Sequence, residues 1–201
     1  MQKKIYEISF EIAGPAAMFS RPDTGSVPIS YPAPTKSALK SIFESVAYSE
    51  KAYFVPQQVE ICTPVVYHKY TTNYGGPLKK QGTDNFQFFA TILENVCYKV
   101  YGVIEAYIPP RTGDNPQHKL KEVFMRRLKS GYLYSTPFLG WKEFVPNYFG
   151  QLREETLPDE SINMTISSLL DTMYDKPTNG KVLPRFKQNI QIVNGVLSYV
   201  E

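Results

Sequence analysis

The feature that most constrains the fold is an alternating segment in the middle of the chain, NVCYKVYGVIEAYI, at residues 95–108. Its side chains change character at every second position, which is the period of a β-strand. One face would carry Tyr98, Val100, Ile104 and Ile108, and the other Lys99, Tyr101, Glu105 and Tyr107. This is the strongest strand signal in the sequence, and it predicts a fold built around a sheet.

The other segments place this strand in a definite order of elements. Apolar residues at helical spacing predict one helix that starts near Thr35 and another that runs from Pro116 to about Lys129. Further strands are predicted at residues 6–12, 52–67 (one or two strands) and 132–145. The order strand, helix, strand, strand, helix, strand predicts an α+β chain with a ferredoxin-like βαββαβ domain, the arrangement also found in RNA-recognition domains.

The end of the chain is expected to form something smaller. It contains an acidic loop at residues 153–160, a predicted short helix near Thr165–Met173, and two alternating runs around Asn194-Gly195, which is a strong signal for a two-residue hairpin turn. We therefore expect a ferredoxin-like domain over residues 1–148 and a small C-terminal β-rich extension over residues 149–201.

Composition excludes several classes of protein. A chain of 201 residues with 42% hydrophobic content can bury a core without disulfides or a structural metal. Cys62 and Cys97 lie too far apart in the sequence for a metal-binding motif, and this favours free thiols in a reducing compartment. We expect a cytoplasmic protein, because the N-terminus does not resemble a signal peptide and no apolar run approaches a membrane span. Without a zinc motif, a P-loop or a GxGxxG sequence, we expect neither a metal nor a cofactor.

One helix concentrates the positive charge and one of the two histidines. In NPQHKLKEVFMRRLKSG, residues 115–131, Asn115 is the expected N-cap, Pro116 the first helical residue and Gly131 the end of the helix. The net charge is only +3, yet His118 is followed by five cations and one acid, a pattern that favours a polyanionic partner. The helix cations are Lys119, Lys121, Arg126, Arg127 and Lys129.

The predicted face of His118 favours chemistry over packing. Helical spacing directs Leu120, Phe124 and Leu128 toward the core and His118 away from it, so a buried structural histidine is disfavoured. An imidazole that exchanges a proton near neutral pH is suited to acid–base cleavage of RNA, in which the 2′-hydroxyl attacks the adjacent phosphate without a metal. A solvated helix face with an idle histidine stays the alternative, and His68, in YHKY, is expected to be idle or a minor RNA contact.

Two segments resemble a known family. GPAAMFSRPDTGSVPISYPAPTKSALKSIFESV, residues 14–46, resembles the opening of the Cas Five family of CRISPR-associated RAMP proteins, and DNPQHKLKEVFMRRLKSGYLYSTPFLGWKEF, residues 114–144, resembles its subtype I-C members. The likeness covers roughly residues 4–146. It implies a ferredoxin-like domain with a C-terminal β extension, and a place at the 5′ end of CRISPR RNA in a type I surveillance complex beside Cas Seven and Cas Eight subunits.

The resemblance also implies residue roles. Family members that cut repeat RNA use a tyrosine near the end of the first helix and a lysine–histidine pair at the start of the second. His118 matches the histidine, Tyr48 lies at or one residue beyond the tyrosine, where Ala47 is the other candidate, and Gln117 stands where the lysine is expected. Lys119 or Lys121 would then replace the lysine.

The candidate site residues fall into two groups. The catalytic candidates are His118, Tyr48, Lys119 and Lys121. The RNA-binding candidates are Arg21, Tyr31, Lys36, Gln117, Arg126, Arg127 and Lys129. The leading hypothesis is a metal-independent endoribonuclease that processes CRISPR precursor RNA and keeps the product, and the alternative is a non-catalytic subunit that binds the 5′ handle. A metal-dependent DNA nuclease ranks below both, because the sequence has no carboxylate cluster.

Overall fold

The computed structural model of the chain describes residues 4–25, 27–74, 86–107, 114–174 and 182–200. The elements are β1 Glu7–Ala17, α1 Lys36–Val46, β2 Ala52–Ile61, β3 Val66–Tyr74, β4 Phe86–Ala106, α2 Pro116–Ser130, β5 Tyr148–Gly150, β6 Met164–Tyr174, β7 Val182–Val193 and β8 Val196–Ser198. Part of the predicted loop around residues 71–85 and of the segment before α2 lies outside the described residues. Among the described residues, no helix is both long and apolar enough to cross a membrane.

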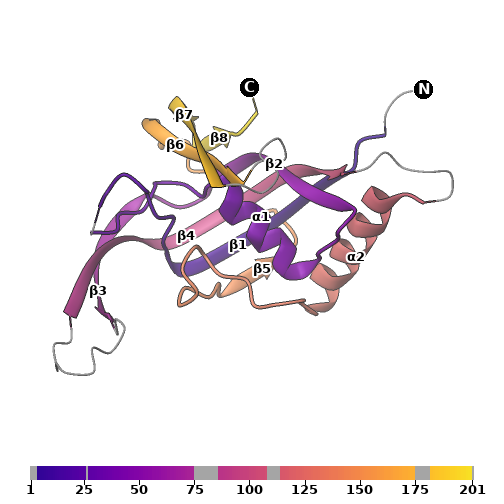
Figure 1. The fold of residues 1–201 in the computed structure, drawn as a ribbon, viewed down its shortest axis with the longest axis horizontal. Helices are drawn as coiled ribbons and strands as arrows, with labels where there is room; N and C mark the ends of the chain where they lie inside the picture. Colours follow the sequence, from indigo (N-terminus) through magenta and orange to yellow (C-terminus); the bar gives the residue numbers. More distant parts are fainter. Residues whose placement is uncertain (1–3, 26, 75–85, 108–113, 175–181, 201) are drawn as a thin grey trace.

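The strands form one sheet with the order β5-β1-β4-β2-β8-β7-β6, and β3 pairs with the N-terminal part of β4 (Figure 1). The first four of these strands have the ferredoxin-like order, in which β1 and β2 both pair antiparallel with β4 while β5 pairs with β1. Helix α1 connects β1 to β2, and α2 connects β4 to β5, so each helix is a crossover between parallel strands. The predicted fold class is confirmed.

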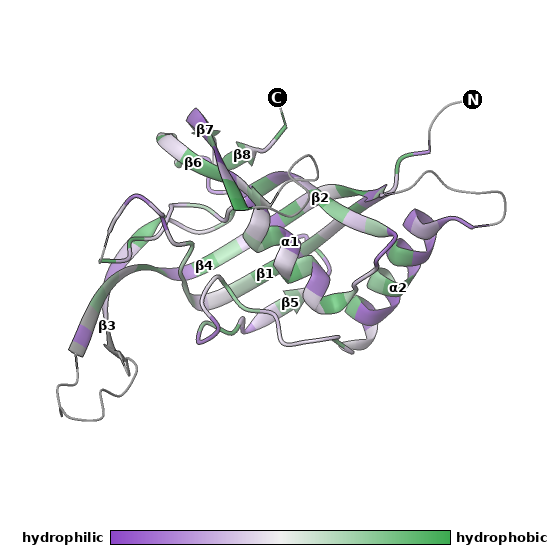
Figure 2. Ribbon diagram, viewed as in Figure 1, coloured by the Kyte–Doolittle hydropathy of each residue, from purple (hydrophilic) through white to green (hydrophobic). Residues whose placement is uncertain are grey.

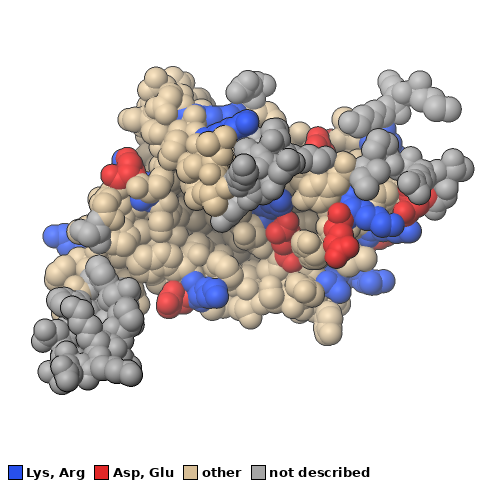
Figure 3. Space-filling model, viewed as in Figure 1, with Lys and Arg blue, Asp and Glu red and all other residues tan. Residues whose placement is uncertain are grey.

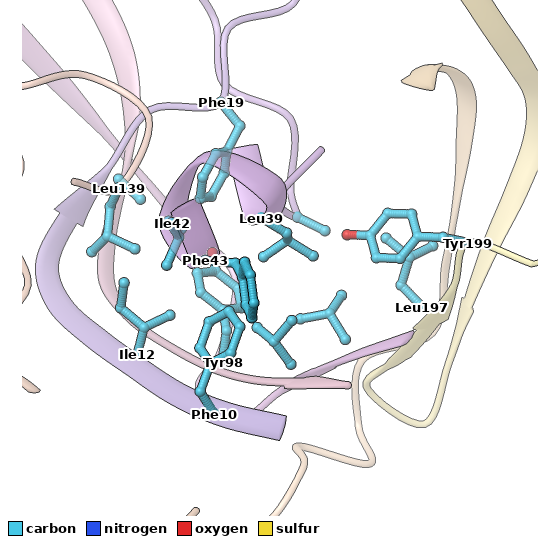
Figure 4. Packing of buried hydrophobic residues seen from close by; sticks show 14 of the residues in the cluster. Phe10, Ile12, Phe19, Leu39, Ile42, Phe43, Tyr98, Leu139, Leu197 and Tyr199 are labelled. Atoms are coloured by element: carbon cyan, nitrogen blue, oxygen red, sulfur yellow. The ribbon is translucent and has the colours of Figure 1, made fainter. Parts of the chain in front are cut away.

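Stacked aromatic rings fix both helices on the same face of the sheet. The ring of Phe43 in α1 lies 4.3 Å from that of Phe124 in α2 and 4.7 Å from that of Phe54 in β2. Figure 4 shows Phe43 above Phe10 and Ile12 of β1, and Figure 2 shows α2 with apolar residues on one side and polar residues on the other. This shared core holds both helices against the sheet, and hydrogen bonds to Tyr6 and to Ile104 of β4 place the start of α2.

Two predicted elements are wrong. Residues 132–145 form turns and bends rather than a strand, and the last strand of the ferredoxin-like order is the short β5, which spans the predicted domain boundary at residue 148. The predicted helix at 165–173 is strand β6. Ile166 and Leu169 have helical spacing, but they are buried on opposite faces of a strand that pairs with β7.

The predicted turn at Asn194-Gly195 is confirmed. Both residues have positive φ, 49° and 74°, as a type I′ turn requires. A Cβ on Gly195 would lie 2.6 Å from the carbonyl oxygen of Asp159, so only glycine fits there. The turn leads into β8, which pairs with β2 and thereby joins the C-terminal strands to the main sheet.

A buried carboxylate holds the acidic loop against the other face of the sheet. Glu11 on β1 is fully buried and accepts hydrogen bonds from the guanidinium (2.8 and 2.5 Å) and backbone N–H (2.8 Å) of Arg153 and from the hydroxyl of Thr156 (3.0 Å). Burial alone would raise the pKa of Glu11, but the hydrogen bonds from Arg153 and Thr156 outweigh it and lower this pKa.

We expect Arg153→Met to destabilise the protein by about 2–4 kcal/mol at pH 7, because it leaves a buried carboxylate with fewer partners. The pKa of Glu11 is lowered on folding, so its contribution to stability is present above its unfolded pKa of about 4.3 and is lost as the pH falls through the folded value. The gap between parent and variant in urea unfolding should therefore shrink at acid pH. Arg126→Met, at an exposed arginine, is the matched control, and an equal loss in both variants would contradict the assignment.

Candidate active site at the start of the second helix

The start of α2 is fixed by its capping residue. The side-chain oxygen of Asn115 accepts from the N–H of His118 (3.0 Å), and its amide nitrogen donates to the hydroxyl of Tyr6 (2.5 Å), which ties the cap to the chain just before β1. Pro116 is the first helical residue, and Gly131 ends the helix with a φ of 70°. The cap, the proline and the final glycine were predicted, whereas the bond to Tyr6 was not, and together they fix where the first turn begins.

His118 faces solvent beside an aromatic ring. Its side chain is 54% exposed, Nδ1 lies 4.0 Å from a carboxylate oxygen of Glu122, and the ring centre is 6.1 Å from that of Tyr6. The imidazole thus lies next to the Tyr6 ring and is open to solvent over about half of its surface.

A hollow of about 200 Å³ lies between the segment that follows α1 and the first two turns of α2, and His118 is not one of the described residues in its lining. We call it the smaller hollow, and its polar lining is Tyr48, Ser49, Lys51, Asp114 and Lys119. The carboxylate of Asp114 bridges the ammonium groups of Lys119 (2.8 Å) and Lys51 (3.1 Å). These two cations lower the pKa of Asp114, Lys119 more than Lys51. Two cations placed together at the start of a helix form a candidate phosphate site.

The structure brings two of the four catalytic candidates together. Tyr48 is 59% exposed whereas Ala47 is buried, so the tyrosine is the accessible residue after α1. Tyr48 and Lys119 share the smaller hollow, but neither His118 nor Lys121 is among the described residues that line it. Lys51 and Asp114 were missed. Asp114 stands in the Asp-Asn-Pro signature before α2, which could have drawn attention to it, whereas nothing local marks Lys51.

A larger hollow, of about 790 Å³, lies on the other side of the α2 start. It is bordered by the chain before β1, the end of β4 and the cap of α2, and its lining includes Lys4, Tyr6, Gln57, Glu105, Tyr107, Asn115 and Gln117. Gln117 is half-buried, and its amide donates to the carbonyl of Ile104 (3.2 Å). The residue in the expected lysine position is therefore anchored to β4.

Three RNA-binding candidates have structural partners instead. Tyr31 is buried, and its hydroxyl accepts from the N–H of Leu170 (3.2 Å), so the expectation that it contacts RNA is wrong. Arg127 donates to the last carbonyl of α1, at Val46 (2.8 Å), and joins the two helices. Lys36 pairs with Asp171 of β6 (3.1 Å) and is mostly covered.

The remaining candidates are solvent-facing. Arg126 and Lys129 are exposed on α2, and Arg21 is exposed in a bidentate pair with Asp23 (3.1 and 2.7 Å). His68 on β3 is also exposed, with Nδ1 4.0 Å from a carboxylate oxygen of Glu94. Figure 3 shows cations and acids interleaved over α2 rather than one uniformly basic surface. Among the described residues, no three His, Cys, Asp or Glu side chains gather as a metal site would require.

Comparison with known proteins points to one family. Residues 7–168 match the family model described as CRISPR-associated protein (Cas_Cas5). A curated relative from Thermus thermophilus, the CRISPR pre-crRNA endoribonuclease Cas5d, is 28% identical over 170 residues, which cover 81% of this chain and 71% of the relative.

Solved structures share the fold. A crystal structure of a CRISPR-associated protein matches with a TM-score of 0.76 and 17% identity, covering 100% of this chain and 95% of the other. A functionally uncharacterized protein from Streptococcus mutans matches over the same shares, with a TM-score of 0.72 and 17% identity. A chain of a CRISPR RNA-guided surveillance complex has a TM-score of 0.54 and 13% identity, covering 94% of this chain and 90% of the other.

Proposed function

This chain belongs to the Cas5 family of CRISPR-associated proteins, and from that premise we propose that it is an endoribonuclease that cleaves the repeats of CRISPR precursor RNA. The observation that carries the proposal is the first turn of α2, where the exposed His118 directly precedes Lys119, and Lys119, Lys51 and Tyr48 line one hollow. The proposal therefore rests on the residues of this site as well as on family membership.

The reaction uses a nucleophile that the RNA itself supplies. The 2′-oxygen forms a bond to the adjacent phosphorus, and the bond from phosphorus to the 5′-oxygen breaks. A base removes the proton of the 2′-hydroxyl, and an acid delivers a proton to the leaving 5′-oxygen. The products are a 2′,3′-cyclic phosphate and a 5′-hydroxyl. This reaction needs a group that moves protons and a cation that stabilises the charged phosphorane, and as proposed it needs no metal.

The residues divide these tasks. His118 moves the proton at one end of the reaction as general acid or base, and the hydroxyl of Tyr48 orients the RNA or assists at the other end. Lys119, rather than Lys121, holds the phosphorane oxygens, because Lys119 lines the smaller hollow. Lys51 adds a second cation that the sequence alone did not suggest.

After cleavage, the protein would stay on the 5′ handle of the product as part of a type I surveillance complex with Cas Seven and Cas Eight subunits. Exposed cations on α2, Arg126 and Lys129, would contact the RNA backbone, and Arg21 would do so from the long loop after β1. Family membership supports this assembly, and we propose a cytoplasmic location together with it.

A second function, binding the 5′ handle without cleavage, is favoured by one observation. Gln117 occupies the position where cutting relatives are expected to have lysine, and its amide is committed to the carbonyl of Ile104. Incubating the purified protein with repeat hairpin RNA, with and without EDTA, separates the two functions. Cleavage in both samples supports the endoribonuclease, tight binding of an intact strand supports the second function, and cleavage that requires added metal contradicts the proposed chemistry.

We expect Asp114→Asn to tighten RNA binding severalfold, because the carboxylate competes with phosphate for Lys119 and Lys51. The dependence of log affinity on log salt should steepen by about 0.7–1. Equilibrium binding at several salt concentrations measures both quantities. Glu122→Gln, at an exposed acid beside His118 and outside the smaller hollow, is the matched control. Equal effects of the two variants would contradict a phosphate site at these lysines.

A further inference from the structure

The two cysteines of the chain take no part in the proposed reaction, but the fold brings them together. Cys62 and Cys97 are the only cysteines in the sequence, and both are free thiols. Cys62 comes directly after β2 and is half-buried, whereas Cys97 lies within β4 and is buried. With two cysteines the chain can form only one intramolecular disulfide, and the backbone geometry determines whether that bond fits.

The backbone places Cys62 and Cys97 opposite each other on antiparallel strands. Ile61 pairs with Tyr98 at the end of the ladder between β2 and β4. One residue further, the N–H of Cys62 donates to the carbonyl of Cys97 (2.9 Å). Opposite residues joined in this way have Cα atoms about 5.5 Å apart, inside the range of about 4.4–6.8 Å that disulfides span, and their side chains project from the same face of the sheet. A bond between the two sulfurs therefore requires no rearrangement of the strands.

The two thiols also contact each other and a charged pair. A hydrogen bond from the Cys62 thiol lowers the pKa of Cys97, and the same bond, together with burial, raises the pKa of Cys62. The Cys97 sulfur lies 3.6 Å from a carboxylate oxygen of Glu11 and 4.0 Å from a guanidinium nitrogen of Arg153. Since the thiolate is the reactive form of cysteine, Cys97 is the sulfur expected to react first.

We propose that Cys62 and Cys97 form an oxidation site, at which a small peroxide converts the two thiols into a disulfide that joins the end of β2 to β4. The Cys97 thiolate attacks one oxygen of hydrogen peroxide, the O–O bond breaks, and a sulfenic acid and hydroxide form. The Cys62 sulfur then displaces the sulfenic oxygen, which leaves as water with the Cys62 proton, while the hydroxide takes up the proton that Cys97 released. The two sulfurs are oxidised, and the peroxide is reduced to two molecules of water.

The disulfide would constrain the chain between its two ends. It closes a loop that contains β3, and this restricts the unfolded chain more than the folded one. Oxidation also removes the thiol proton of Cys97 from Glu11, but Glu11 keeps its hydrogen bonds from Arg153 and Thr156. Exchange with a dithiol restores the thiols, so the modification is reversible. We therefore expect the oxidised protein to keep its fold and to resist unfolding better, independently of any action on RNA.

Oxidation of the purified protein tests the site directly. Reduced protein, freed of reductant, is treated with stoichiometric hydrogen peroxide, alkylated in urea and weighed intact by mass spectrometry. The parent should lose the mass of two hydrogen atoms, take up no alkyl group and stay monomeric on a non-reducing gel, and dithiothreitol should restore both thiols. A parent that keeps both thiols, gains only oxygen atoms or forms a disulfide-linked dimer overturns the proposal.

Two controls separate a pair that is positioned by the fold from two cysteines that meet by chance. Disulfide formation should be at least about tenfold faster in the native protein than in protein unfolded in urea, because the strands hold the sulfurs together. The oxidised parent should unfold at a higher urea concentration than the reduced parent, and peroxide should give Cys62→Ser no such gain. Equal rates in native and unfolded protein, or an oxidised parent that unfolds at a lower urea concentration than the reduced one, would show that the strands do not accommodate the bond and would overturn the proposal.

Discussion

Replacing His118 by alanine is expected to slow cleavage of repeat RNA by about 10²–10⁴-fold, the usual contribution of a positioned acid or base. The affinity for RNA should stay within a few-fold of the parent, because the cations that hold phosphate are on other residues. Single-turnover cleavage of a labelled hairpin, with a parallel binding titration, gives both quantities.

The chain contains a matched control for this change. His68 is 58% exposed with a carboxylate oxygen 4.0 Å from Nδ1, and His118 is 54% exposed with a carboxylate oxygen at the same distance. The two imidazoles have similar surroundings, but His68 lies on β3, whereas His118 lies in the first turn of α2 beside Tyr6. His68→Ala should therefore cleave like the parent. Equal rates for both variants would exclude His118 from the reaction.

Replacing Lys119 by alanine is expected to reduce the cleavage rate by about 10²–10³-fold, since it removes a charge directed at the phosphorane. Lys119→Arg should recover part of the rate, because it restores the charge with a different shape. The matched control is Lys121→Ala, two residues along the same helix and not among the described residues that line either hollow. A larger loss from Lys121→Ala than from Lys119→Ala would transfer the role to Lys121.

The local features of the candidate site could be predicted from the sequence. Asn115, Pro116 and Gly131 define the ends of α2 through capping chemistry that acts within one turn, and the helical period places His118 away from the core. The strand period defines β4 in the same way. These predictions held because each depends on residues that are close in the chain.

The contacts between distant segments could not be predicted. Lys51 and Asp114 are 63 positions apart, and their ion pair exists only because the segment between α1 and β2 meets the start of α2 in the folded chain. The helix pattern predicts Arg127 as part of an RNA-binding face, and its hydrogen bond to Val46, 81 positions away, adds a link between the helices that no local pattern indicates. Tyr31 was likewise assigned to RNA by its motif, although tertiary packing buries it.

Irregular segments were the other source of error. Residues 132–145 are as aromatic as a strand, yet Tyr132 and Tyr134 are exposed and the N–H of Ser135 donates to the carbonyl of Ser45 (2.8 Å) at the end of α1. Aromatic content alone therefore did not distinguish a strand from a covering loop.

The most direct test of the proposed mechanism removes a single atom from the substrate, the 2′-oxygen at the scissile position. We predict that repeat RNA with a 2′-deoxy nucleotide at the scissile position is bound by the protein in EDTA but stays intact, while the all-ribose RNA is cut to a product that ends in a 2′,3′-cyclic phosphate. Cleavage of the deoxy-substituted strand at the same position would show that another nucleophile attacks the phosphate, and would contradict the proposed roles of His118 and Lys119.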